Sequence, residues 1–186
     1  MIALLDIDGV LVDFESAALQ VHGVNDAKKF RTLPRQLGVW DMTVGLDISM
    51  DEFWKPIDEA GAEFWEGLEK YSHFDTVLNF VHNEFTSWYL CSAPSRCPTS
   101  YTGKVNWIQK EFGRDFDRFF LTPHKEMLAN PGRCLIDDRF INVQNFSAHG
   151  GHALLFPSLA NNLHKFADDP ISCLKSQKND YLGLTI

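Results

Sequence analysis

The opening stretch MIALLDIDGVLVDF most constrains the fold of this chain, because it places carboxylates within an apolar run. Residues 2–7 have the composition of a strand buried on both faces of a sheet, yet the stretch carries Asp6 and Asp8. An unpaired carboxylate is unstable in a protein interior, so each needs a compensating partner. Two interpretations are open: Asp8 and Gly9 form a hairpin turn, or the strand ends by presenting Asp6 and Asp8 to a metal ion and a phosphoryl group.

Apolar runs and amphipathic patterns alternate along the rest of the chain. This alternation predicts an α/β fold, with a Rossmann-like parallel sheet wrapped by helices. In such sheets ligands bind beyond the carboxyl ends of the strands. Strands are expected at residues 2–7, 86–91, 118–121, 133–136 and 152–156, and helices at residues 14–22, 102–112 and 140–149.

The segment between the first strand and residue 72 is polar and interrupted by glycine and proline, which predicts an insert. Ser49 and Glu52 have the spacing of a capping box, so at least one helix is expected there. With 186 residues and 45% apolar composition, the chain is long enough for one core and a small insert. We therefore predict a core formed by residues 1–13 and 72–186, with a helical cap at residues 14–71.

The formal net charge of −8 disfavours a nucleic acid polymer as partner, because affinity for nucleic acid comes mainly from lysine and arginine. A small phosphorylated substrate needs only a few basic residues and a metal ion. No apolar run reaches transmembrane length, so no membrane partner is expected. The four cysteines include no CxxC pair, which favours reduced thiols in a cytoplasmic protein. The oligomeric state stays open, with a homodimer among the alternatives.

Polar residues with complementary chemistry follow the predicted strands, at the edge of the sheet where ligands bind. Phosphoryl transfer requires an in-line nucleophile, a proton donor and neutralisation of the phosphoryl charge. Asp6 could attack phosphorus to form an aspartyl-phosphate, and Asp8 could deliver the proton as general acid. Ser92 and Lys125 could hold the phosphoryl oxygens. Lys125 could instead be an ordinary surface lysine.

A further pair of acids, Asp137 and Asp138, follows the strand predicted at residues 133–136. Together with Asp6 and Asp8, they predict an oxygen-lined Mg²⁺ site. The pair could instead cap the following helix, although two adjacent acids exceed what a cap needs. The sequence therefore predicts a metal-assisted phosphoryl site at one edge of the sheet.

The order of these residues resembles the motifs of phosphatases of the haloacid dehalogenase superfamily. The first motif is matched by Asp6-Ile-Asp8-Gly-Val, the second by Leu90-Cys-Ser92, the third by Lys125 and the fourth by Leu135-Ile-Asp137-Asp138. The resemblance implies the superfamily's core fold, a nucleophilic Asp6 and a Mg²⁺ cofactor. In that superfamily an acid two residues after the nucleophile separates phosphatases from dehalogenases, so Asp8 indicates phosphate ester chemistry.

A closer resemblance is to the 5′(3′)-deoxyribonucleotidases. It is carried by DGVLVDFE at residues 8–15, by Lys104 with WIQKEFG at 107–113, by FLT at 120–122 and by LIDDR at 135–139. The resemblance implies hydrolysis of deoxyribonucleoside monophosphates. Ser92-Ala93 stands where that family usually has Thr-Ser. The substrate-binding residues implied in the core are Ser92, Ala93, Lys104 and Arg139, although Lys104 could also be a surface lysine.

Aromatic residues are frequent in and beside the insert, and most are expected to form its own core. One or two could face the catalytic edge and stack on a nucleobase, and Phe14 and Trp40 are the candidates. Two alternatives stay open. The substrate could be another small phosphorylated metabolite such as a sugar phosphate, or the protein could bind phosphate without catalysis, although no residue of the predicted catalytic set is lost here.

Overall fold

The computed structural model describes residues 1–33 and 36–183. Its five-stranded sheet has the order β3-β2-β1-β4-β5, and every neighbouring pair is parallel. This arrangement confirms the Rossmann-like α/β fold and excludes a hairpin at Asp8-Gly9, because β1 pairs in parallel on both sides. The strands are β1 (Ile2–Leu5), β2 (Ser87–Ser92), β3 (Phe119–Leu121), β4 (Arg133–Asp137) and β5 (His152–Leu155).

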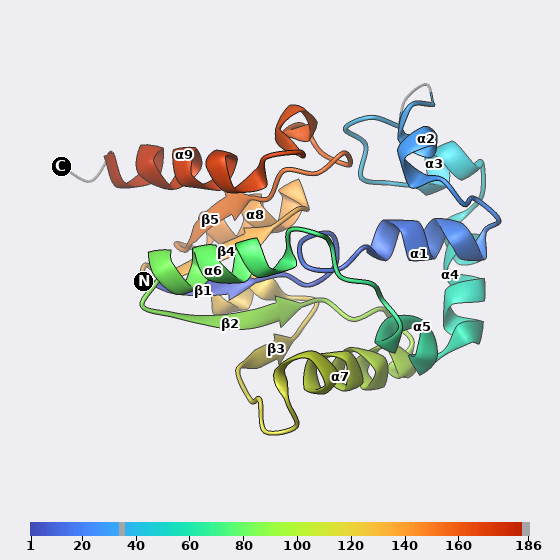
Figure 1. Ribbon diagram of the computed structural model, residues 1–186, viewed down its shortest axis with the longest axis horizontal. Coiled ribbons are helices and arrows are strands. Elements are labelled where there is room, and N and C mark those ends of the chain that lie inside the picture. Colours follow the sequence, from blue (N-terminus) through green and yellow to red (C-terminus); the bar gives the residue numbers. More distant parts are fainter. Residues whose placement is uncertain (34–35, 184–186) are drawn as a thin grey trace.

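Helices cover both faces of the sheet (Figure 1). Ala3 and Leu5 of β1 belong to an apolar cluster shared with helices of one face, whereas Leu4 between them belongs to a second cluster on the other face. In the part of the chain that the structure describes, no helix is both long and apolar enough to cross a membrane. The first face carries α6 (Phe74–Glu84), α7 (Pro98–Phe112) and α9 (Pro170–Gly183), and the second carries η1 (Lys125–Leu128) and α8 (Phe140–Ala148).

The described residues of the insert, 14–33 and 36–71, lie beyond the carboxyl ends of the strands, at the right of Figure 1. The predicted capping box is present, because Ser49 and Glu52 bond each other's backbone at the start of α4. Phe53 and Trp65 from this segment share one apolar cluster with Leu90 of β2, so its packing continues into the core. Its helices are α1 (Phe14–Val21), α2 (Ala27–Arg31), α3 (Thr43–Leu46), α4 (Met50–Ala60) and α5 (Ala62–Glu66), and a short η2 (His164–Phe166) follows β5.

The first residues of helices α1 and α7 account for Asp13 and Pro98, whose structural roles the sequence pattern did not assign. Asp13, the third acid of the opening stretch, caps α1, because its Oδ1 accepts a hydrogen bond from the Ser16 backbone at 2.9 Å. Helix α7 begins at Pro98, one turn before the predicted start, since proline is well suited to the first turn of a helix. The extra turn shortens the loop between β2 and α7.

Candidate active site

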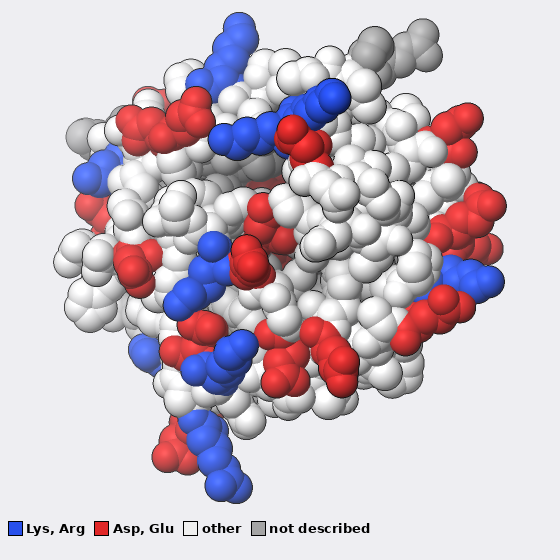
Figure 2. Space-filling model, turned by 45° about the vertical axis from the view of Figure 1, so that its right-hand side comes forward, with Lys and Arg blue, Asp and Glu red and all other residues white. Residues whose placement is uncertain are grey.

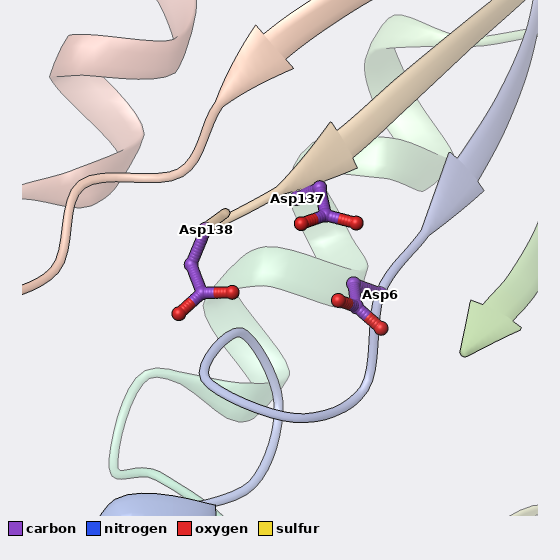
Figure 3. A group of neighbouring side chains, drawn as sticks. All are labelled: Asp6, Asp137 and Asp138. Atoms are coloured by element: carbon purple, nitrogen blue, oxygen red, sulfur yellow. The ribbon is translucent and has the colours of Figure 1, made fainter. Parts of the chain in front are cut away.

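The carboxyl ends of the central strands bring the predicted acids together. Asp6 directly follows β1, and Asp137 and Asp138 end and follow the neighbouring β4. One oxygen of each of these three carboxylates lies within 4.8 Å of the others, and all three residues are buried. Figure 3 shows the three side chains gathered at the strand ends, above the loop that follows β1. We call Asp6, Asp137 and Asp138 the acidic triad.

Glycine at position 9 allows the loop after β1 to pass close to the triad. Gly9 has a φ of +74°, in the left-handed region that favours glycine. A Cβ at this position would lie 2.3 Å from Oδ2 of Asp138. Any larger residue at this position would strain the backbone and displace the Asp138 carboxylate.

Lys125 occupies the centre of the acidic residues. Its side chain is 3% exposed, and its Nζ lies 2.7 Å from Oδ2 of Asp6 and 2.6 Å from Oδ2 of Asp137. Burial lowers the pKa of this ammonium, but Asp137 and Asp6 raise it by more, so the net shift is upward. The surface-lysine alternative is therefore wrong for Lys125, which is a buried cation at neutral pH.

The triad carries more negative charge than Lys125 can compensate. Burial raises the pKa of Asp6 to about 8, with Lys125 opposing the shift and Asp137 and Asp8 adding to it. Burial and the neighbouring Asp137 also raise the pKa of Asp138. When all three carboxylates are ionised, one ammonium leaves two negative charges without a counterion, and a divalent cation would compensate both. Oxygen donors of this kind are the ligands that Mg²⁺ prefers, so the residues fit that ion.

The orientation of Asp137 is fixed by several donors. Its Oδ1 accepts hydrogen bonds from the Arg139 backbone at 2.9 Å and from Nδ2 of Asn142 at 3.1 Å, and its Oδ2 accepts from Lys125. Helix α8 has Arg139 at its N-cap and no side-chain cap bond. The helix-cap alternative therefore does not describe this pair of acids.

Asp8 lies outside the triad and has partners of its own. Its Oδ2 forms an ion pair with Lys104 and lies 3.5 Å from Oγ of Ser92. Ser92 is buried at the end of β2, and Lys104 is only 2% exposed on α7. Lys104 is therefore no surface lysine either. A part for the Asp8 carboxylate in metal binding stays a prediction.

A cavity of about 220 Å³ opens beside these residues. Aromatic rings line it from the side of the insert: Phe14 stacks on Trp65 with centroids 5.5 Å apart, and Trp54 lies next to both. Figure 2 shows this side of the molecule hollowed, with acidic side chains in and beside the hollow. The predicted residues that line the cavity are Asp6, Asp8, Phe14, Trp40, Ala93, Lys125, Asp138 and Arg139, while Ser92, Lys104 and Asp137 lie behind its lining.

Trp40 and Arg139 meet at the edge of the cavity. The Arg139 guanidinium lies 4.1 Å from the centroid of the Trp40 ring, a cation–π distance. Trp40 is 41% exposed, so part of its ring stays free. The structure thus joins a predicted residue of the insert to a predicted residue of the core.

Two polar residues that sequence reasoning missed also belong to this region. Arg31 is buried, lines the cavity and forms an ion pair with Glu15 at 2.6 Å. Because α2 contains other basic residues, nothing in the local sequence indicates that Arg31 is the buried one. Asn142 bonds both carboxylate oxygens of Asp137. Its position one turn after the acid pair could have indicated a contact.

The fold and the clustered acids at its strand ends match what the resemblance to hydrolases of the haloacid dehalogenase superfamily implied. A solved hydrolase from Streptococcus pneumoniae TIGR4 has the same fold, with a TM-score of 0.50 and 16% identity over 90% of this chain and 97% of that one. The family model described as 5′ nucleotidase, deoxy (Pyrimidine), cytosolic type C protein matches residues 1–169, and the chain belongs to that family. The protein is therefore a phosphomonoesterase of the 5′-nucleotidase type.

Two relatives span almost the whole chain. The mitochondrial 5′(3′)-deoxyribonucleotidase of Mus musculus is 25% identical over 199 residues, which cover 94% of this chain and 86% of the relative. The enzyme of the same name from Homo sapiens is 27% identical over 198 residues, covering 94% and 82%. The similarity thus includes the insert as well as the sheet.

Proposed function

We propose that this protein is a magnesium-dependent 5′(3′)-deoxyribonucleotidase that hydrolyses deoxyribonucleoside monophosphates to a nucleoside and phosphate. The observation that carries the proposal is one cavity bounded by the acidic residues and Lys125 on one side and by aromatic rings on the other. A phosphate group suits the first side and a nucleobase suits the second. The names of the two mammalian relatives support the same substrate class.

The first half of the reaction transfers the phosphoryl group to the protein. Asp6 attacks phosphorus with a carboxylate oxygen, and the bond from phosphorus to the ester oxygen breaks. Asp8 gives its proton to that oxygen, which leaves as the hydroxyl of the nucleoside. Lys125, which lines the cavity, holds a phosphoryl oxygen. The product of this half is an aspartyl-phosphate on Asp6.

The second half releases phosphate. Asp8 is now a carboxylate and takes a proton from a water molecule, whose oxygen attacks phosphorus. The bond between phosphorus and the Asp6 oxygen breaks, which restores the carboxylate. A magnesium ion held by Asp6, Asp137 and Asp138 would supply positive charge to the phosphoryl group throughout. Asn142 keeps the Asp137 carboxylate in place.

Phosphate release from a panel of substrates tests this proposal. The panel contains 2′-deoxyribonucleoside monophosphates, the matching ribonucleotides, sugar phosphates and a baseless aryl phosphate, each with Mg²⁺ and with a chelator. We expect the deoxyribonucleotides to have the highest kcat/KM, and the chelator to abolish turnover. Higher kcat/KM for a sugar phosphate would contradict the substrate class, and full activity in the chelator would contradict the metal requirement.

A further inference from the structure

Lys104 is a buried cation whose contacts all lie within the protein. Besides its ion pair with Asp8, its Nζ donates to Oγ of Ser92 at 3.1 Å and lies 4.6 Å from the ring centroid of Trp65. A buried ammonium is stable only with such partners. Lys104 does not line the substrate cavity. Its contacts therefore point to a role other than the direct substrate binding that the sequence implied.

The neighbouring glycine explains how Lys104 reaches this position. A Cβ on Gly103 would lie 2.3 Å from the backbone oxygen of Ala62 and 2.6 Å from Cβ of Trp65. Helices α5 and α7 can therefore touch along their backbones only with glycine at 103. This close approach places Lys104 under the Trp65 ring, next to the carboxylate of Asp8.

Asp8 depends on Lys104 more than on any other group. Its Oδ1 is buried and has no hydrogen-bond partner among the described residues. Its Oδ2 has Lys104 as its charged partner, and Ser92 lies at the long distance of 3.5 Å. Asp8 follows Asp6 by two residues, so a cation bound to the triad would attract its carboxylate. A proton-transfer group that turned toward that cation would no longer face the leaving oxygen.

We propose that Lys104 is a positioning residue, which holds the Asp8 carboxylate beside Ser92 and away from the acidic triad. The inference rests on the proposed function, because it concerns the group that delivers the proton to the leaving oxygen. Trp65 and Gly103 determine where the Lys104 ammonium lies, and Lys104 in turn determines where the Asp8 carboxylate lies. The aromatic side of the cavity is thereby connected to the catalytic side through a single buried cation.

A structure of the Lys104→Met variant with Mg²⁺ bound tests the positioning directly. We expect the Asp8 side chain to turn from Ser92 toward Asp6 and Asp138, while the backbone of the loop is unchanged. An Asp8 carboxylate that keeps its place beside Ser92 would overturn the proposal. This readout needs no turnover, so it stands even if the protein proves inactive on every nucleotide, which would contradict only the proposed function.

Kinetics of the same variant separate positioning from the other possible roles. General acid catalysis is worth about a hundredfold or more, so kcat of Lys104→Met on a deoxyribonucleotide should fall by roughly that factor with little change in KM. The loss should be several-fold smaller on an activated aryl phosphate, whose leaving oxygen needs no proton. Lys104→Arg should recover part of the rate, and Lys110→Met, on the exposed face of α7, should behave like wild type.

Two kinetic outcomes would contradict the inference. A raised KM with unchanged kcat would make Lys104 a substrate-binding residue. Equal losses of kcat on both substrates, together with a lowered melting temperature in Lys104→Met and Lys104→Arg, would make its role structural only.

Discussion

At the scale of single residues, buried acids and buried lysines lie together at the carboxyl ends of the strands. Lys125 bridges Asp6 and Asp137, Lys104 holds Asp8, and the remaining carboxylate of Asp138 has no cation of its own among the pairs described. Pairing keeps the charged forms stable in the interior. The uncompensated charge makes this edge suitable for a divalent cation, and such a cation would in turn attract a phosphoryl group.

Trp40 tests whether aromatic residues select the nucleotide. Loss of a stacked base typically costs about 1–3 kcal/mol, so Trp40→Ala should lower kcat/KM on a deoxyribonucleotide by roughly ten- to a hundredfold. A baseless aryl phosphate should be nearly unaffected. The matched control is Leu37→Ala, which removes an exposed side chain outside the cavity lining. Equal losses on both substrates would remove Trp40 from base recognition.

At the scale of elements, the loop after β1 depends on its glycine. Gly9 and Gly23 both have positive φ values, +74° and +77°, but only a Cβ at position 9 would meet Asp138, while position 23 has open space. Alanine in a left-handed conformation costs about 1–2 kcal/mol at either site. At position 9, the added Cβ would also clash with the Asp138 side chain and displace this member of the triad.

The two alanine variants therefore separate backbone strain from damage to the site. Gly9→Ala should lose turnover and most of its stabilisation by Mg²⁺, whereas Gly23→Ala should be less stable than wild type but fully active. Thermal melting with and without Mg²⁺, together with steady-state kinetics, checks both. Similar activity losses in the two variants would show that Gly9 is needed only for folding.

The elements themselves could be predicted from local sequence, with small errors at their ends. Strands with apolar runs and helices with regular spacing were located within a few residues, because burial on a parallel sheet requires those patterns. The sequence predicts the start of α7 at 102 instead of Pro98, because the apolar spacing that indicates this helix begins only at Val105. Acids at strand ends were likewise found, because the strand ends of a parallel sheet meet at one edge.

Contacts between distant elements could not be predicted in this way. The ion pair of Lys104 with Asp8 joins residues 96 positions apart, and nothing local marks either as the other's partner. Arg31 and Glu15 pair through the packing of two short helices. Such contacts depend on how the elements pack in three dimensions. The periodicity of a single sequence carries no information about that packing. The division into a core and a cap likewise stays a prediction.

At the scale of the whole molecule, the triad links folding stability to pH and to magnesium. The pKa of Asp6 is raised from 3.8 to about 8, mainly by burial, and that of Asp138 is raised as well. Between these pH values the metal-free native state binds more protons than the unfolded chain. Its free energy of unfolding should therefore fall as the pH rises through this range.

Magnesium should reverse this trend, because it binds the ionised carboxylates of the native state. Melting temperatures of wild type and Asp138→Asn, measured from about pH 5 to about pH 8 with a chelator and with Mg²⁺, check the prediction. The difference between the two proteins isolates the contribution of Asp138, whose pKa is raised in the native state. A metal-free wild type that gains stability relative to Asp138→Asn as the pH rises would contradict it.

The most direct test of the account is the chemistry of Asp6 itself. Acid quenching during turnover of a deoxyribonucleotide with Mg²⁺, followed by mass spectrometry of the N-terminal peptide, should find a phosphoryl group on Asp6. The Asp6→Asn variant should carry none, and its turnover should be abolished while its circular dichroism spectrum stays that of wild type, because the amide keeps the shape and loses the nucleophile. Substantial turnover by a folded Asp6→Asn protein would contradict the account.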